Sequence, residues 1–193
     1  LPAGLTTLEG YLFPDTYRLP VPAQPSDLIG RMLDNFELKV TEEVLAPARQ
    51  AGRTVEQVVI MASIVEREAP LADERPLVAS VYWNRTSGAC SPQTGGAYLQ
   101  ADPTVQYAAG RAGEWWWKPP NVEAYATVQS PYNTYLRPGL PPSAIASPGL
   151  SAIAAAAQPA ETQYCFFVAT GENGAHVFAT TLAEHEANIA AYQ

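Results

Sequence analysis

The sequence predicts an α+β fold that is mainly helical and carries a small antiparallel sheet. Two observations support this class. Apolar residues recur every three or four positions through much of the first half of the chain, which is the spacing of helices with one buried face. Near the C-terminus, two short runs rich in aromatic and β-branched residues flank the turn Gly171–Gly174, which is typical of a hairpin.

The first half of the chain is expected to begin with two helices. Apolar spacing predicts the first over residues 27–50, capped by Ser26, with Pro47 as an alternative, earlier end. Thr54 and Gln57 have the spacing of a capping box, so a second helix should start there and continue past the apolar residues that follow.

A third helix is predicted from Asp73 to Arg85, after Pro70 has ended the second. The rest of the chain alternates short elements with loops, all within one domain over residues 1–193. In chain order we expect extended pieces over 8–20, a Ser/Gly-rich loop over 86–98, a short helix over 102–107 capped by Asp102, an irregular excursion over 110–128, a structured loop over 132–148, a helix over 150–157, strands over 164–169 and 176–179, and a helix over 181–192.

The composition excludes several classes of protein. The 193 residues carry a formal net charge of -8, which argues against binding to nucleic acid or to anionic lipid. No apolar run reaches the roughly 18 to 20 residues of a membrane helix. The first residues resemble the interior of a protein, so we expect any membrane anchor to lie outside this chain. Two cysteines and two histidines, far apart in sequence, are too few for a metal site, and no cofactor is expected.

The cysteines and histidines leave choices open. Cys165 lies in the apolar run Tyr164–Val168, where a small buried thiol is the commonest role. A disulfide to Cys90 would suit an exported protein, but the sequence does not establish it. His176, in a predicted strand, is expected to be a hydrogen-bonded structural residue, and His185 is expected on a solvated helix face.

The segment Ile60–Glu68 is the most informative for chemistry because two acidic residues end an apolar run. A carboxyl group packed against apolar side chains has its charged form disfavoured, so its pKa rises and it can donate a proton near neutral pH. Glu66 lies at the edge of the apolar stripe, whereas Glu68 should lie on a different face of the helix. The ordinary alternative is a solvated Glu66 paired with Arg67 or Arg75.

Polar and aromatic clusters downstream are of the kind that bind sugars. Gln100 and Asp102 are placed to point into a groove from a loop-to-helix junction, although Asp102 could be a helix cap alone. Tyr132–Tyr135 offers aromatic faces, an amide and hydroxyls, with a rigid Pro-locked loop as the alternative. Phe13–Tyr17 repeats this chemistry. Trp115–Trp117 is either a stacking platform or, more commonly, a set of partly buried loop anchors.

Taken together, these clusters resemble the MltG (YceG-like) family of endolytic murein transglycosylases. The chain departs from the family's pattern between Arg85 and Leu99, where it has an insertion containing Cys90, and in the Trp-rich segment 114–118. The blocks that carry the resemblance run in order over residues 8–17, 62–68 (Ala-Ser-Ile-Val-Glu-Arg-Glu), 78–85, 99–105, 130–135, 139–142, 145–149 and 164–169.

The resemblance implies a catalytic domain that works on peptidoglycan at the outer face of the bacterial cytoplasmic membrane. In the family a membrane anchor and a LysM-like subdomain precede this domain, and we expect both to lie outside residues 1–193. The implied partners are peptidoglycan glycan strands and, less directly, proteins of the wall-synthesis machinery.

The resemblance also implies a reaction and a set of site residues. Glu66 would protonate the oxygen of the MurNAc-β-1,4-GlcNAc bond and then accept the proton of the muramyl C6 hydroxyl, leaving a 1,6-anhydro end without consuming water. Asn133 and Gln100 would orient the substrate, and Tyr132 and Tyr135 would shape the groove. Glu68 and Arg75 would fix either Glu66 or the fold near it. The full set expected to contact or organise the glycan site is Tyr17, Ser63, Glu68, Arg75, Asn84, Gln100, Asp102, Tyr132, Asn133, Thr134 and Tyr135.

Two alternatives remain at this stage. One is a muramidase that hydrolyses the same bond with Asp102 as the second carboxylate, since hydrolases use two carboxyl groups. The other is a non-catalytic peptidoglycan-binding module of the wall-synthesis machinery. The released ends separate the first from a transglycosylase, and release of no fragments indicates the second.

Overall fold

The computed structural model describes residues 5–111, 113–117, 119 and 122–192. The predicted class is confirmed: helices dominate, and the described residues contain one two-stranded antiparallel sheet. Within them, no helix has both the length and the apolar character needed to cross a membrane. The elements are α1 (Pro25–Lys39), α2 (Glu42–Gln50), α3 (Val55–Glu68), η1 (Ala72–Glu74), α4 (Arg75–Thr86), α5 (Ser91–Thr94), α6 (Asp102–Ala109), η2 (Val122–Thr127), α7 (Leu150–Ala157), β1 (Phe166–Ala169), β2 (His176–Ala179) and α8 (Leu182–Tyr192).

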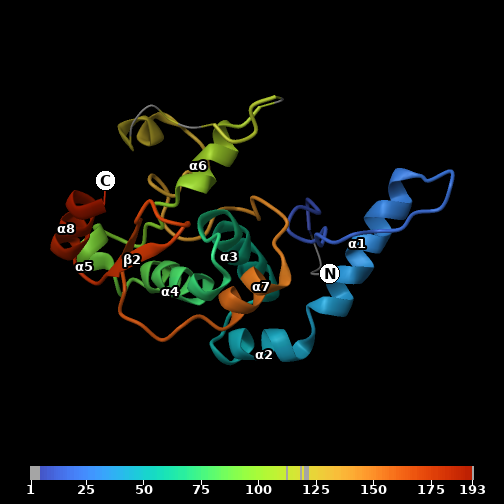
Figure 1. Ribbon diagram of the computed structural model, residues 1–193, viewed down its shortest axis with the longest axis horizontal. Helices are drawn as coiled ribbons and strands as arrows, with labels where there is room; N and C mark the ends of the chain where they lie inside the picture. The colour runs from blue at the N-terminus through green and yellow to red at the C-terminus, as the bar shows by residue number, and fades with distance from the viewer. Residues whose placement is uncertain (1–4, 112, 118, 120–121, 193) are drawn as a thin grey trace.

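The core is built around α3, which lies in the middle of the molecule with α4 and α7 beside it (Figure 1). Every residue from Val58 to Val65 is buried, because apolar or small side chains occupy all faces of this stretch. The alanine-rich α7 packs most extensively against α3, and its small side chains allow a close approach. The helix that ends in the two glutamates is therefore held rigidly from several sides.

The predicted helix over 27–50 is in fact two helices. The chain leaves the helical conformation at Val40, whose side chain is buried, and then continues as α2 toward α7. Pro47, the break considered from the sequence, lies inside α2 without ending it. Packing of Phe36 and Val40 into the core, rather than the proline, sets this break.

Of the three helix caps predicted from the sequence, one is present in the structure and two are not. Thr54 and Gln57 form the predicted capping box: Gln57 N donates to Thr54 Oγ1 at 3.2 Å, and Thr54 N donates to Gln57 Oε1 at 2.8 Å. Gln24, not Ser26, is the N-cap of α1. Asp102 is the first residue of α6 rather than its cap, so its carboxylate is directed elsewhere.

The predicted hairpin is confirmed. β1 and β2 pair antiparallel, with Phe167 opposite Phe178. The loop expected over 86–98 contains the short helix α5, and its Cys90 forms a disulfide with Cys165, with the two Cα atoms 5.6 Å apart. The structure therefore resolves the open choice: Cys165 is both buried and bonded, and the insertion is tied to the residue just before β1.

Candidate active site

The C-terminal end of α3 opens on a cavity of about 400 Å³. Side chains from α3, α4, α6, α8, β1 and the loop after Ser130 meet around it. Four of the residues predicted from the sequence line this cavity together: Glu68, Gln100, Asp102 and Tyr135. The remaining lining residues are Tyr82, Arg85, Phe166, Phe167, Leu182 and His185.

Glu68 is the last residue of α3, and its carboxyl group has the environment of a proton donor. Tyr82 donates a hydrogen bond from its hydroxyl to Glu68 Oε1 at 2.6 Å. Burial raises the pKa of Glu68 to about 7, the nearby negative charge of Asp102 also raises it, and the Tyr82 hydrogen bond partly opposes both effects. Both the protonated and the charged forms are thus accessible near neutral pH.

Asp102 brings a second carboxyl group to the same cavity. The hydroxyl of Tyr135 donates to Asp102 Oδ1 at 2.5 Å, and the Tyr135 ring stacks on Tyr125 with centroids 5.3 Å apart. Burial and the charge of Asp102 raise the pKa of Tyr135, so its hydroxyl remains a donor at neutral pH. The cavity therefore holds two carboxyl groups with different hydrogen-bond partners.

Arg85 and Gln100 form the wall between these acids and β1. Arg85 is buried and donates from Nε to Cys165 O at 2.7 Å, and from Nη1 to the carbonyl of Leu99. Gln100 Oε1 lies 3.4 Å from Arg85 Nη1, and Gln100 has a φ of 52°, in the left-handed region that non-glycine residues seldom adopt. Strained backbone of this kind is common where a side chain must be aimed at a ligand.

Several of these lining residues were not predicted as site residues from the sequence. His185 was expected on a solvated face and is instead half-buried, with its ring stacked on Phe166 at 4.8 Å, and burial lowers its pKa. Tyr82 and Arg85 could have been proposed from the sequence, because both lie on the buried face of a predicted helix. A buried charged side chain such as that of Arg85 needs a partner. His176 has the expected structural role: its Nδ1 lies 2.8 Å from Glu74 Oε2.

Glu66 lies in a different environment from Glu68. Arg75 Nη2 donates to Glu66 Oε1 at 3.0 Å, and Gly149 N donates to Glu66 Oε2 at 3.1 Å. Arg75 also donates to Ala69 O at 3.2 Å. Glu66 therefore ties together α3, α4 and the N-terminus of α7, and it is not among the residues that line the Glu68 cavity.

Asn133 and Thr134 are fully buried and cannot touch a glycan in this structure. Asn133 Nδ2 donates to the carbonyls of Tyr125 and Val128, each at 2.8 Å, and Asn133 Oδ1 accepts from Tyr135 N at 3.0 Å. Thr134 Oγ1 accepts from the backbone N–H just before Asp102 at 3.0 Å. These two residues position Tyr135 and Asp102 rather than bind a ligand directly.

Four other predicted residues lie away from the Glu68 cavity. Ser63 is fully buried and accepts a hydrogen bond from Ile145 N at 3.0 Å, which rules it out as a direct ligand. Asn84 holds the segment before β1 through two carbonyls, each at 3.0 Å. The Tyr17 hydroxyl donates to Phe13 O at 2.6 Å, beside α1. Tyr132 belongs to a second cavity.

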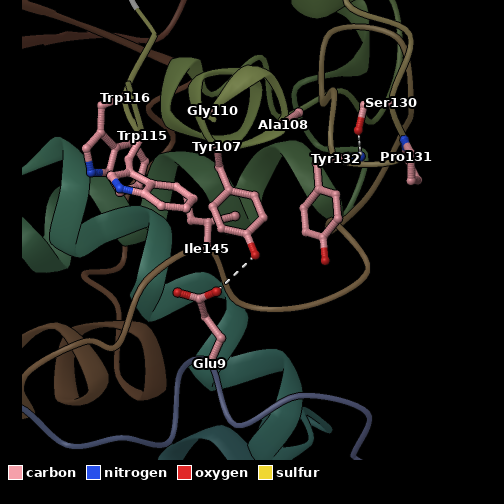
Figure 2. Close-up of a pocket in the computed structure, with 10 residues that line it drawn as sticks. All are labelled: Glu9, Tyr107, Ala108, Gly110, Trp115, Trp116, Ser130, Pro131, Tyr132 and Ile145. Atoms are coloured by element: carbon pink, nitrogen blue, oxygen red, sulfur yellow. Dashed lines mark hydrogen bonds between the residues drawn. The ribbon is translucent and has the colours of Figure 1, made fainter. Parts of the chain in front are cut away.

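That second cavity, of about 660 Å³, is larger and more aromatic (Figure 2). Trp115 and Trp116 lie on one side of Tyr107, and Tyr132 lies on the other. Trp116 and Trp117 are partly buried, as expected of loop anchors, but Trp115 is 66% exposed. We place the candidate active site at the smaller cavity, because it holds Glu68, whose pKa burial raises to about 7. The residues that line the larger one are Glu9, Tyr107, Ala108, Gly110, Trp115, Trp116, Ser130, Pro131, Tyr132 and Ile145.

The chain is similar to a known protein family and to several characterised proteins. The sequence model of the YceG-like family matches residues 2–191. An endolytic murein transglycosylase of Bacillus subtilis (strain 168) is 37% identical over 179 residues, which is 92% of this chain and 46% of the relative. One of Streptococcus pneumoniae serotype 2 (strain D39 / NCTC 7466) is 30% identical over 183 residues, or 95% of this chain and 32% of the relative.

A crystal structure of a yceG-like protein from Listeria monocytogenes has a similar fold. It superposes with a TM-score of 0.79 at 31% identity, covering 96% of this chain and 57% of that one. The chain thus spans less than half the length of the two murein transglycosylases that it matches.

Proposed function

We propose that this chain, which belongs to the YceG-like family, is a lytic transglycosylase that cuts peptidoglycan glycan strands internally at the MurNAc-β-1,4-GlcNAc bond. Two similar proteins carry the name endolytic murein transglycosylase, which supports the substrate class. The observation that carries the chemistry is the Glu68 carboxyl group, in a cavity and with a pKa of about 7.

Glu68 performs both proton transfers in this proposal. Protonated Glu68 donates to the glycosidic oxygen as the C1–O bond breaks, and the GlcNAc side leaves as an alcohol. The Glu68 carboxylate then takes the proton of the muramyl C6 hydroxyl, whose oxygen bonds to C1 and closes the 1,6-anhydro ring. One carboxyl group is regenerated and no water is consumed.

We assign this role to Glu68 rather than to Glu66, which the sequence suggested. Both oxygens of Glu66 accept hydrogen bonds, from Arg75 and Gly149, and these contacts join three helices. Glu68 instead faces the cavity and has a pKa raised toward neutrality. In this proposal Glu66 and Arg75 fix the end of α3, and so hold Glu68 in place.

The other polar groups of the cavity serve the transition state. A breaking glycosidic bond builds positive charge at C1 and the ring oxygen, and a fixed carboxylate such as Asp102 stabilises that charge. Tyr135 fixes the Asp102 orientation through its 2.5 Å hydrogen bond. Gln100 is placed by its backbone to orient the substrate.

A hydrolytic muramidase is the second candidate function, because two carboxyl groups line one cavity. Asp102 lines the same space as Glu68 and could activate a water molecule while Glu68 acts as the acid. The product would then be a reducing sugar instead of an anhydro sugar.

The proposed setting is the bacterial cell envelope, on the outer face of the cytoplasmic membrane, where peptidoglycan is built. Wall-synthesis proteins are proposed as partners from the family alone. A net charge of -8 fits a glycan substrate better than a nucleic acid.

Mass spectrometry of digested murein tests the proposal. Wild type should release anhydro-ended fragments, Glu68→Gln should release none, and Glu66→Gln should still release them, because Gln retains most of the shape and hydrogen-bonding capacity of Glu. Loss with Glu66→Gln but not with Glu68→Gln would return the acid/base role to Glu66. Reducing ends from wild type would indicate hydrolysis. Sedimentation with murein without release of fragments by wild type would indicate a binding module.

A further inference from the structure

The larger, aromatic cavity has no part in the proton transfers, yet it is built as a binding site. Figure 2 shows the Tyr107 hydroxyl pointing to Glu9, and the donor–acceptor distance is 2.9 Å. The rings of Tyr107 and Tyr132 lie 5.0 Å apart at 53°, and Trp115 and Trp116 line the same cavity on the opposite side of Tyr107 from Tyr132. Aromatic faces and a carboxylate thus surround one space.

Contacts to two helices fix the position of the tryptophans. The Trp115 backbone lies so close to Gly110, at the end of α6, that a β-carbon on Gly110 would collide with the Trp115 carbonyl. Arg111 N donates to Glu114 O at 3.1 Å, and Glu114 N donates to Arg111 O at 2.8 Å, which makes an isolated antiparallel bridge just before Trp115. The Arg67 guanidinium, on α3, lies 3.8 Å from the Trp116 ring centroid.

The aromatic cavity and the Glu68 cavity share their supporting elements. α6 contributes Asp102 to the Glu68 cavity and Tyr107 to the aromatic one, about 7.5 Å farther along its axis. The loop after η2 contributes Tyr135 to the first and Tyr132 to the second. The same two segments of chain therefore carry residues of both cavities.

The lining chemistry matches a pyranose ring. A sugar presents an apolar face of C–H groups that stacks on indole and phenol rings, and hydroxyls that bond to carboxylate and hydroxyl oxygens such as those of Glu9 and Ser130. A cationic ligand fits less well, because Arg67 already occupies the face of Trp116. A purely apolar ligand would displace water from the Glu9 carboxylate and offer it no hydrogen bond in return.

We propose that the aromatic cavity is a second saccharide subsite, which binds a sugar of the same glycan strand away from the bond cut at Glu68. It thereby fixes where along the strand the cut falls. The identity of the strand as murein rests on the proposed function, but binding of an N-acetylated sugar to this cavity does not.

Indole NMR tests the subsite directly. The chain has four tryptophans, so four side-chain Nε1–H resonances can be assigned by single Trp→Phe changes. On titration with the β-1,4-linked tetramer of N-acetylglucosamine, the Trp115 and Trp116 resonances should shift. Trp83, which is buried and donates to Ala156 O at 2.9 Å, should not.

A matched pair of variants gives the size of the effect. Trp115→Ala removes an exposed stacking face and should weaken tetramer binding by about fivefold, since a good aromatic contact contributes roughly 1 kcal/mol. It should also change the length distribution of fragments released from murein. Tyr192→Ala removes another exposed aromatic ring, on α8, and should change neither by more than about twofold.

The outcomes separate this inference from the proposed function. If the Trp115 and Trp116 resonances stay fixed while the protein still cuts murein, the subsite is wrong and the activity stands. If they move and Trp115→Ala weakens binding, but no murein is cut, the subsite stands and the activity fails. Equal tetramer affinity in wild type, Trp115→Ala and Trp116→Ala would also overturn the subsite.

Discussion

Glu66 and Glu68 are the same residue type two positions apart on one helix, but their surroundings differ completely. Glu66 is held by a guanidinium and a backbone N–H, whereas Glu68 faces a cavity, a tyrosine hydroxyl and a second acid. A helix rotates by about 100° per residue, so two positions turn the side chain by about 200°. The chemistry at the end of α3 therefore depends on which of its two glutamates faces the cavity.

Replacing Glu66 or Glu68 by Gln should change the free energy of unfolding at pH 8 in opposite directions. The pKa of Glu68 rises from its usual 4.5 to about 7 on folding. Its stabilising contribution is therefore complete below pH 4.5 and is lost as pH rises through 7. Glu68→Gln removes the cost of a buried charge and should raise the free energy of unfolding at pH 8 by up to about 3 kcal/mol. Urea denaturation at pH 8 and pH 4 measures this.

Glu66→Gln is the matched control for Glu68→Gln in the urea denaturation experiment. It replaces the ion pair with Arg75 by a neutral contact and should lower the free energy of unfolding at pH 8 by about 1–2 kcal/mol. At pH 4, Glu68→Gln and wild type should have nearly the same stability. Stabilisation by Glu66→Gln at pH 8 would show that the two environments have been assigned the wrong way round.

Asn133→Ala should disturb the Glu68 cavity and spare the Glu66 contacts. The change leaves two buried carbonyls without their donor and frees the Tyr135 backbone, so we expect a loss of about 2 kcal/mol in stability and more than tenfold in murein cleavage. Thermal unfolding and fragment release measure the two effects. Asn35→Ala, beside Tyr17, is the control and should leave cleavage unchanged. Unaltered kinetics in Asn133→Ala would remove its positioning role.

Two single-atom changes should move the Glu68 titration in opposite directions. The Tyr82 hydrogen bond lowers the pKa of Glu68 and the Asp102 charge raises it. Tyr82→Phe should therefore shift the titration to higher pH, and Asp102→Asn should shift it to lower pH, each by less than about one unit. NMR titration of the Glu68 side-chain carboxyl carbon reports both even where cleavage is lost. Shifts in the same direction would contradict the electrostatic account of the cavity.

Several features followed from local sequence alone. The Thr54–Gln57 capping box, the helix over 150–157 and the hairpin that pairs Phe167 with Phe178 depend on residues close together in the chain, and all three are present. The family resemblance, rather than local sequence, placed Gln100, Asp102 and Tyr135 in one site, and these three residues line one cavity.

Other features required the packed molecule. Val40 ends α1 because of where its side chain is buried, and no local signal overrides the helical spacing around it. The Cys90–Cys165 pair joins residues 75 positions apart, which spacing cannot predict. His185 enters the Glu68 cavity because α8 packs on β1, a contact between elements that the sequence placed but did not orient.

By itself, then, the sequence determined an α3 helix that ends in two acids, together with the polar clusters that were to meet it. The tertiary structure decided that Glu68 faces the cavity and that Glu66 binds Arg75 and Gly149. The physical reason is that local propensity fixes the period of a helix, but only packing against α4 and α7 fixes its rotation about its own axis. That rotation determines which carboxyl group is desolvated, and hence which one has a pKa near neutrality.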